Sequence, residues 1–224
     1  MQVTKVRSVV LRAAVAVVSV ACSVSQASAE FVFQPTDDTY VKMNDLVYGD
    51  KPHLQIRNEG SGGIWEENVL IRFDLAEIPP GTSIDSATLS LWYFDYHDSS
   101  PAGRPLTCHR ILQDWDEDTV TGFTLPDYVG DPCATSLVPG KMGEWMTWDV
   151  TEEVRAFMAG EDADNFGWLI QDPTYWGGAG IPRPLFRSKE YGDFVPYLTV
   201  VPEPAAALLL LSLGLMARRG GRDR

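Results

Sequence analysis

The sequence predicts an all-β protein: a jelly-roll-like antiparallel β-sandwich with one short helix. Apolar residues recur with a period of two, the apolar runs are short, and clusters of Gly, Pro and Asp separate them. The 172 residues over 30–201, which lie between two terminal segments of different composition, are enough for one domain with a buried core. We therefore expect a single sandwich domain over 30–201.

The first 29 residues have the composition of a secretory signal peptide. Lys5, Arg7 and Arg12 precede an apolar stretch over 13–24, and small residues at 27–29 follow it. A cationic start, an apolar middle and a small-residue end are the features by which such leaders are recognised and cut. We expect cleavage before Glu30 and export of the mature chain.

About nine strands are expected along the mature chain. In the run 68–75, Val69, Ile71 and Phe73 fall on one face while Arg72 and Asp74 fall on the other, as in a half-buried strand. The run 87–93 alternates in the same way. The expected strands are 39–43, 54–57, 68–75, 87–93, 106–112, 145–150, 166–171, 185–188 and 197–201.

One short helix is expected after the sixth of these strands. The residues that share its apolar face are Val150, Val154, Phe157 and Met158. Asp149 and Glu152 have the spacing of a capping box, and Gly160 supplies a C-terminal stop. A helix this short is expected to close one end of the sandwich.

The expected mature domain is strongly acidic. The whole chain has 18 Lys and Arg against 31 Asp and Glu, and the two ends hold seven of the cations but only two of the carboxylates, Glu203 and Asp223. The domain over 30–201 therefore keeps 11 cations and 29 carboxylates, a formal charge of −18. Such a domain repels polyanions, so we expect no nucleic acid partner.

The tail over 202–224 has three parts in order. Pro202, Glu203 and Pro204 come first, an apolar run over 205–217 follows, and the Arg-rich end begins with Arg218 and Arg219. As a transmembrane helix the apolar run spans about 20 Å, short of a hydrocarbon core of about 30 Å, so it engages a membrane only marginally. The arginines hold it on the cytoplasmic side. The arrangement resembles the PEP-CTERM sorting signal, which implies recognition by an exosortase and a destination in the cell envelope, at the cell surface or in the extracellular matrix.

Two cysteines remain in the mature domain. Cys22 leaves with the signal peptide, so Cys108 and Cys133 are the expected disulfide of an exported protein. Closing a 26-residue loop would stabilise the fold by about 3 to 4 kcal/mol in the chain-entropy model. The alternative is two free thiols.

Six landmarks occur in order along the mature chain. They are residues 38–41, 70–75, 115–121, 149–151, 186–190 and 196–198. Together they resemble the DNRLRE domain, a β-sandwich group that includes alginate-binding carbohydrate-binding modules. The resemblance implies a non-catalytic module of secreted and surface proteins. The chain departs from the pattern in its acidity, because an alginate binder benefits from a basic groove.

Cations of the last strands and of two earlier ones are the first binding candidates. Arg72 and Glu190 lie on landmarks and are expected to pair with each other, which leaves the other cations available to a saccharide. The candidates are Lys42, Arg57, Arg187 and Lys189. The alternative is that scattered cations only neutralise local charge on an acidic surface.

Aromatic residues in or beside loops are the second candidates. Flat rings at the rim of a sandwich can stack on sugar rings. The candidates are Trp65, Tyr175 and Trp176, with Trp92 and Tyr96 on the outer side of a strand. The alternative is that these rings cap the ends of the core.

No catalytic arrangement stands out, because the three histidines are isolated and no nucleophile motif occurs. The stretch over 114–118 alternates carboxylates and is the most metal-like, with Asp37 and Asp38 as further oxygen donors for Ca²⁺. The alternative is an acidic turn anchored by Trp115. No cofactor is required, and Ca²⁺ is retained as an option.

We therefore expect an exported, non-catalytic surface or matrix protein that binds extracellular polysaccharide. The alternative is a structural or adhesive protein that contacts other proteins.

Overall fold

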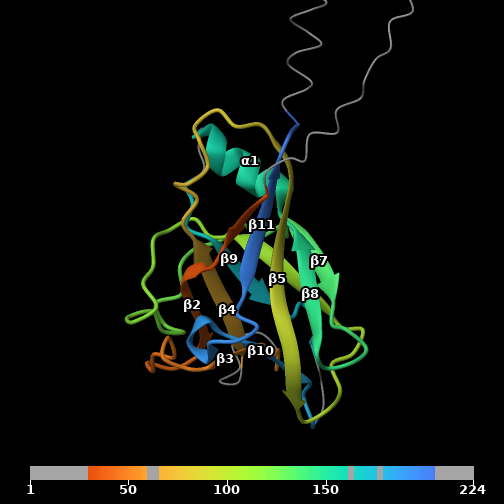
Figure 1. Ribbon diagram of the computed structural model, residues 1–224. Coiled ribbons are helices and arrows are strands. Elements are labelled where there is room, and N and C mark those ends of the chain that lie inside the picture. Colours follow the sequence, from red (N-terminus) through yellow and green to blue (C-terminus); the bar gives the residue numbers. More distant parts are fainter. Residues whose placement is uncertain (1–29, 60–65, 161–163, 176–178, 205–224) are drawn as a thin grey trace, which may run out of the picture.

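The computed structural model describes residues 30–59, 66–160, 164–175 and 179–204, and within them it shows two antiparallel sheets. The first sheet has the order β1 (Phe31–Phe33), β11 (Tyr197–Pro202), β5 (Ile84–His97), β10 (Arg183–Arg187) and β3 (His53–Gln55), with β8 (Glu144–Asp149) paired to β5. The second has the order β2 (Pro35–Lys42), β4 (Glu67–Phe73), β9 (Trp168–Gln171), β6 (Pro105–Arg110) and β7 (Ala134–Leu137). The all-β, antiparallel sandwich fold with one short helix is confirmed (Figure 1).

Strand β5 organises the first sheet. It is 14 residues long and pairs along one edge with β11 and then β10, and along the other edge with β8. Its first residue, Ile84, lies at the end of the sandwich that carries α1 (Thr151–Ala159), and its last, His97, lies at the opposite end (Figure 1). The strand therefore spans the molecule from the helix to the end where β10 begins beside His97.

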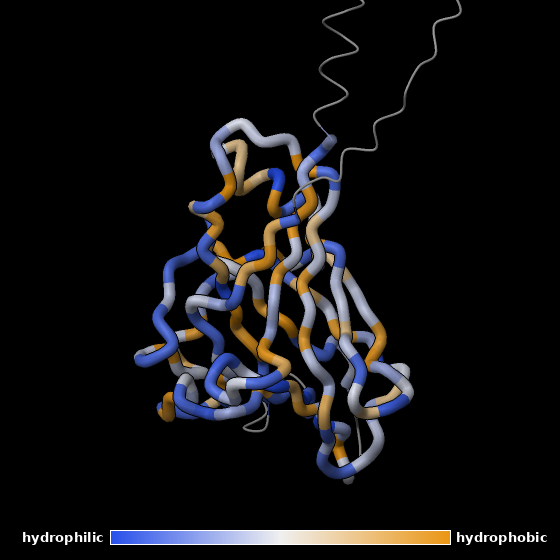
Figure 2. Tube along the Cα trace, viewed as in Figure 1, coloured by the Kyte–Doolittle hydropathy of each residue, from blue (hydrophilic) through white to orange (hydrophobic). Residues whose placement is uncertain are grey.

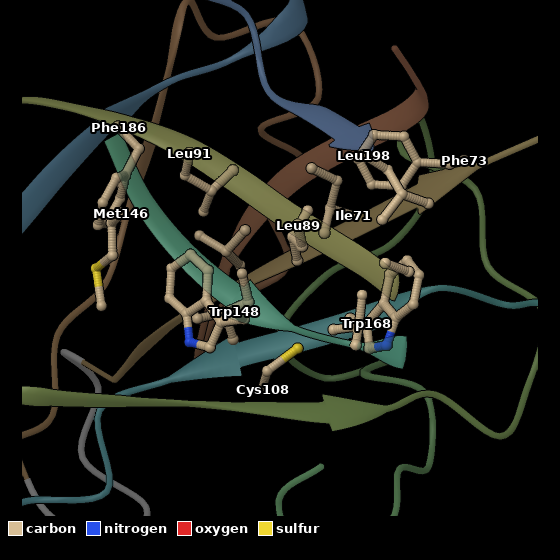
Figure 3. Close-up of a cluster of buried hydrophobic side chains, with 14 of the residues drawn as sticks. Ile71, Phe73, Leu89, Leu91, Cys108, Met146, Trp148, Trp168, Phe186 and Leu198 are labelled. Atoms are coloured by element: carbon tan, nitrogen blue, oxygen red, sulfur yellow. The ribbon is translucent and has the colours of Figure 1, made fainter. Parts of the chain in front are cut away.

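The main core lies between the two sheets. Side chains from the first sheet, such as Leu89, Trp148 and Phe186, meet Ile71 and Trp168 from the second (Figure 3). Each of these five is at most 1% exposed. The inward positions are those that the two-residue period assigns to one face, and Figure 2 shows apolar positions recurring along the strands.

A second, smaller cluster covers the outer face of the second sheet. Val41, Leu70 and Leu169 point outward from three neighbouring strands and are buried by Trp115 and other residues of the segment over 111–128. The indole of Trp115 donates to the carbonyl of Phe166, with 2.8 Å between Nε1 and the oxygen. Strand β4 is therefore buried on both faces over most of its length, which its expected alternation of apolar and charged residues did not indicate.

The helix begins and ends where the sequence suggested, but its cap differs. Gly160 ends it in the left-handed conformation at φ 66°, as expected. The capping box is wrong: Val150 is the N-cap residue and makes no side-chain capping bond, while Asp149 accepts from the amide of Thr151 at 3.0 Å. Phe157 lies 5.5 Å from the ring of Trp168 and closes this end of the core.

All nine expected strands are present, with shifted ends. The two that the sequence did not indicate, β1 and β7, are three and four residues long and lie at the edge of each sheet. No helix among the described residues is long and apolar enough to cross a membrane. The expected leader over 1–29 and the apolar and Arg-rich parts of the tail over 205–224 lie outside the described residues.

Candidate functional site

Three cations surround one buried carboxylate at the end of the sandwich opposite α1. Glu67, the first residue of β4, is fully buried and lies on the face that points between the sheets. Its Oε1 is 3.2 Å from Nζ of Lys42 on β2 and 3.9 Å from Nη1 of Arg183 on β10. The site therefore joins the two sheets through side chains from three strands.

Arg57 is the third cation of this site. Its amide donates to the carbonyl of Glu67 at 3.0 Å and its carbonyl accepts from the amide of Glu67 at 2.9 Å. This backbone bridge brings the guanidinium into the field of the Glu67 carboxylate. We call Lys42, Arg57, Glu67 and Arg183 the end cluster; with Glu67 ionised its formal charge is +2.

Aromatic rings form one wall of the end cluster. The rings of Tyr40 and Tyr48 stack with centroids 4.5 Å apart, and Nζ of Lys42 lies 5.4 and 5.2 Å from them. The ring of His53 also stacks on Tyr40, with the two centroids 5.7 Å apart. Cation–π attraction thus helps to hold the Lys42 ammonium in place beside Glu67.

The cations of the end cluster change the titration of their neighbours. Burial raises the pKa of Glu67, and the charges of Lys42 and Arg183 oppose that rise. Burial lowers the pKa of His53, and the nearby His97, Lys42 and Arg183 lower it further. His53 is therefore uncharged at neutral pH, and the positive charge of this end comes from the lysine and the two arginines.

The loop that carries Tyr175 lies beside the end cluster. The side-chain Nδ2 of Asn58, next to Arg57, donates to the carbonyl of Asp172 at 2.6 Å, and the Asp172 carboxylate forms an ion pair with Arg104 at 2.6 Å. Tyr175 follows and is 66% exposed. Trp65 and Trp176, the other two candidate rings, lie outside the described residues.

The remaining predicted cations lie elsewhere. Arg187 packs between two rings, 3.9 Å from the centroid of Phe94 and 3.2 Å from that of Tyr191. Lys189 forms ion pairs with Glu117 and Glu190, at 2.6 and 2.8 Å. The structure thus brings Lys42 and Arg57 together and places Arg187 and Lys189 in two other environments.

The expected pair of Arg72 and Glu190 is wrong. Arg72 instead forms a fork with Asp37, at 3.0 Å from Nε and 2.9 Å from Nη2, and reaches Asp114 with Nη1 at 2.5 Å. Glu190 faces Lys189. Because Asp37 is opposite Arg72 in the β2–β4 register, the two strands themselves supply the partner.

The carboxylates nearest to a metal-ligand arrangement agree only in part with those expected: Asp38 and Glu117 were predicted, and Glu190 was not. Asp37 and Asp114 are engaged by Arg72, and Asp116 accepts from the amide of Asp118 at 2.8 Å. Among the described residues, the group that converges is Asp38, Glu117 and Glu190, with ligand atoms within 4.8 Å of one another.

This acidic group already contains a cation of the protein. Nζ of Lys189 lies against Glu117 and Glu190, and hydrogen bonds to them keep the pKa of Lys189 above its usual value despite the opposing effect of burial. Burial raises the pKa of Asp38, whose Oδ2 accepts from the amide of Lys189 at 2.9 Å. The group therefore works as an ion-pair network that fixes the segment after β10 against β2.

The two cysteines are neighbours and are free thiols in the structure. The amide of Cys133 donates to the carbonyl of Cys108 at 2.9 Å, and Sγ of Cys133 lies 3.2 Å from the same oxygen. The expected disulfide is not formed here and stays a prediction for the exported protein.

Sequence reasoning missed Glu67 and Arg183 as partners of Lys42 and Arg57. Glu67 was one of two adjacent acidic residues and resembled a solvated surface position. Its one sequence signal is the two-residue period, which places it on the same face as Val69 and Ile71. An acidic residue at an inward position requires a buried cationic partner.

Comparisons with known proteins agree with the geometry. A family model described as carbohydrate-binding module family 96 matches residues 29–202. A second model, described as the PEP-CTERM protein-sorting motif, matches residues 200–224. No curated protein matches the chain.

Proposed function

Since the chain belongs to carbohydrate-binding module family 96, we propose that it is an exported protein that binds polysaccharide through the end cluster without altering it. The observation that carries this proposal is the convergence of Lys42, Arg57 and Arg183 on one buried carboxylate. The side chains of Lys42 and Arg183 are 20% and 21% exposed, so their outer N–H groups can reach a ligand.

The chemistry of the end cluster favours an acidic saccharide. A guanidinium can bind a carboxylate with two parallel hydrogen bonds, and charge-assisted bonds of this kind are roughly twice as strong as neutral ones. The uronate carboxylates of an alginate-like polymer fit this description. The sequence resemblance to alginate-binding modules supports the same ligand class.

The acidity of the domain does not argue against this site. At physiological ionic strength the Debye length is about 8 Å, so exposed carboxylates farther away are largely screened. Asp98 is an exception, because its Oδ2 lies 3.9 Å from Nη2 of Arg183, so a ligand carboxylate competes with Asp98 for that guanidinium. The overall charge is expected to slow the encounter with a polyanion rather than to abolish binding.

The exposed ring of Tyr175 supports a supplementary contact. It lies on the loop that Asn58 fixes beside the end cluster, and a flat exposed ring can stack on a pyranose. Trp65 and Trp176 are proposed to act in the same way, because the segments that carry them adjoin Glu66 and Tyr175 in the sequence.

The destination of the protein follows from its ends. The sorting motif is typical of exported surface proteins, and the signal peptide expected over 1–29 supports the same route. We propose that an exosortase recognises Pro202, Glu203 and Pro204, and that the tail engages the membrane until it is processed. The domain over 30–201 then acts in the envelope, at the cell surface or in the matrix.

Affinity electrophoresis tests the proposal. Residues 30–204 carry all the described strands, the core between the sheets and the helix, so they are the unit to use. In gels that contain alginate, the wild type should be retarded, and the double variant Lys42→Met with Arg183→Met should lose at least about tenfold in affinity, since each lost charge-assisted bond contributes about 1.5 to 3 kcal/mol.

A matched control carries the same change of charge elsewhere. Lys51→Met with Lys141→Met removes two exposed cations outside the end cluster and should bind as the wild type does. Equal retardation of all three proteins would reject the end cluster as the site. No retardation of the wild type by any acidic or neutral polysaccharide would reject the function.

The second candidate function is a structural or adhesive protein, and one observation favours it. The edge strands β1 and β7 carry Val32 and Leu137, each 61% exposed. An exposed apolar residue on an unpaired edge invites strand pairing with another chain. This function predicts self-association or capture of a partner that added polysaccharide does not disturb.

A further inference from the structure

A second group of aromatic rings lies on the outer face of the first sheet, away from the core. Trp92 on β5 and Trp145 on β8 are directly opposite each other in the register, with ring centroids 5.1 Å apart in an edge contact. Tyr197 on β11 meets Trp145 from the other side, with centroids 4.7 Å apart. Their inward neighbours Leu91, Met146 and Leu198 are buried in the core, so these three rings face outward.

Phe194 completes this group at a conformational cost. Its ring stacks on that of Trp92, with centroids 4.4 Å apart and an angle of 18° between the planes. Its backbone has φ 53°, the left-handed region that a bulky residue rarely adopts. The ring is nevertheless 54% exposed. A strained backbone that presents a large apolar ring to solvent is an arrangement that stability alone does not favour, and such strain is concentrated at functional sites.

A cation lies next to the rings. The segment that carries Phe194 also carries Tyr191, and the guanidinium of Arg187 is held between the rings of Tyr191 and Phe94. Rings on both sides fix the plane of the guanidinium. It therefore offers oriented hydrogen-bond donors at the edge of the aromatic group.

Hydroxyl groups continue the outer face beyond the rings. Thr147 lies opposite Ser90, which is itself buried, and Thr199 lies opposite Thr88; the three threonines alternate with core residues on their strands. Thr147 is exposed, and Thr88 and Thr199 are half-buried. The outer face thus offers flat apolar rings beside short polar side chains, which suits the apolar face and the hydroxyl rim of a sugar ring.

We propose that Trp92, Trp145, Phe194 and Tyr197, with Arg187 at their edge, form a second saccharide-binding surface, and that its ligand is an uncharged pyranose chain. This inference rests on the proposed function and adds a site of different chemistry. The end cluster lies at the mouth between the sheets and is cationic, whereas this surface lies on the outside of one sheet and has one cation. A chain with both sites can link an acidic polysaccharide to a neutral one.

A saccharide suits this surface better than a protein partner does. A stable protein interface buries about 800 Å² on each side and is built around a fully buried apolar centre. Here Phe194 is the one ring of the proposed surface that is more than half exposed, and hydroxyls border the rings directly. Stacking on a sugar needs only one ring-sized apolar face.

The test uses residues 30–204 in two sets of affinity gels, one with neutral polysaccharides (glucan, xylan, mannan and galactan) and one with alginate. Phe194→Ala should reduce retardation by at least one neutral polysaccharide about tenfold and leave retardation by alginate unchanged. Phe194→Trp keeps a flat ring and should retain neutral binding. Phe123→Ala removes a ring that is 68% exposed in the segment over 111–128, on the other sheet, and serves as the matched control.

This design distinguishes rejection of the second surface from rejection of the end cluster. If Phe194→Ala binds every neutral polysaccharide as the wild type does, or the wild type binds none, the second surface is overturned, whatever the alginate gels show. If the wild type self-associates in gel filtration and Phe194→Ala abolishes this without changing neutral binding, the surface belongs to a protein contact and the inference also falls. Loss of alginate binding in the Lys42→Met, Arg183→Met protein, with neutral binding intact, supports both sites.

A mixing experiment tests the linking activity. The wild type should make a mixture of alginate and the bound neutral polysaccharide turbid, and either the Phe194→Ala protein or the double end-cluster variant should not. Turbidity that persists in both variants would contradict the two-site inference.

Discussion

The ring of Phe194 stacks on the ring of Trp92 although the backbone of Phe194 is in the left-handed region, at φ 53°. The two residues come from a strand and from a segment about a hundred positions later, so the contact fixes the course of the chain between β10 and β11. The stacking energy and the backbone strain are both of the order of 1 kcal/mol and oppose each other.

That opposition predicts an unusual order of stabilities. Phe194→Ala loses the ring and keeps the strain, so it should lower the free energy of unfolding by about 1 to 2 kcal/mol. Phe194→Gly also loses the ring but relieves the strain, so it should be about 1 kcal/mol more stable than the alanine variant. Urea denaturation of both measures the difference. A glycine variant less stable than the alanine variant would show that the segment around 194 is not strained.

The buried indole of Trp148 should be sensitive to the loss of its nitrogen. Its Nε1 donates to the carbonyl of Leu106 at 3.0 Å and the side chain is 1% exposed (Figure 3). Trp148→Phe leaves a cavity and removes the partner of a buried carbonyl, so we expect a loss of about 2 to 4 kcal/mol. Trp145→Phe, on the outer face of the same strand, should cost less than about 1 kcal/mol in thermal unfolding. Similar losses in the two variants would contradict the assignment of inner and outer faces.

Asp38 should make the protein less stable as the pH rises. Burial raises the pKa of Asp38 in the folded state above its unfolded value near 3.8, with Glu190 adding to the rise. The folded state therefore holds this proton more tightly, and the stability that results is complete below about pH 4 and is lost as the pH rises through the folded pKa.

The variant Asp38→Asn isolates this effect because its amide cannot ionise. Its melting temperature relative to the wild type should increase between pH 4 and pH 7. Asp85→Asn changes an exposed carboxylate on β5 and should show no such trend. If the difference in melting temperature between the wild type and the Asp38→Asn variant stays constant with pH, Asp38 has an ordinary pKa.

Replacing only one partner of the Arg104–Asp172 ion pair should lower the free energy of unfolding strongly. Asp172 is 4% exposed and accepts from Nε and Nη2 of Arg104 at 2.8 and 2.6 Å. Arg104→Met leaves a buried carboxylate without its main partner, so we expect a loss of about 3 to 5 kcal/mol. The double variant with Asp172→Asn should recover part of that loss. Additive losses in a double-mutant cycle would mean that the two groups do not interact.

The cysteine pair should become a disulfide after export. Cys108 is fully buried, and burial raises the pKa of its thiol, so it should react slowly with alkylating agents in the folded reduced protein. Mass spectrometry of the exported protein, unfolded in iodoacetamide without reductant, should show no alkylation. The double variant Cys108→Ser with Cys133→Ser should melt at a lower temperature than the oxidised wild type and at about the same temperature as the reduced wild type. Two alkylated thiols in the exported protein would establish the free form.

The sequence predicted the strands well where only one face of a strand is buried in the core. The alternation in 68–75 and 87–93 places every second residue between the sheets, and the structure confirms those faces. It did not indicate β1 and β7, because three or four residues carry too little alternation to distinguish an edge strand from a loop. It also missed the burial of Leu70 and Leu169 on the outer face, because the segment that covers them is distant in the chain.

The candidate site was predicted only in part. Lys42 and Arg57 were chosen as cations of a groove, and they do lie together, but Arg187 and Lys189 do not join them. Arg72 was assigned the wrong carboxylate, because register decides which residues face each other and the sequence does not specify register between distant strands. Trp145, Phe194 and Tyr197, which join the predicted Trp92 on the outer face, were not among the candidates, because their ring contacts depend on how distant strands lie together.

Fold class, helix position and the three-part tail could be derived from the amino-acid sequence, because each depends on residue type at short spacing. The contact of Glu67 with Arg183, more than a hundred residues later, and the stacking of Phe194 on Trp92 became evident only from the folded chain. Contacts of this kind depend on strand order and register, which are set by the free energy of packing the whole sandwich rather than by any local pattern.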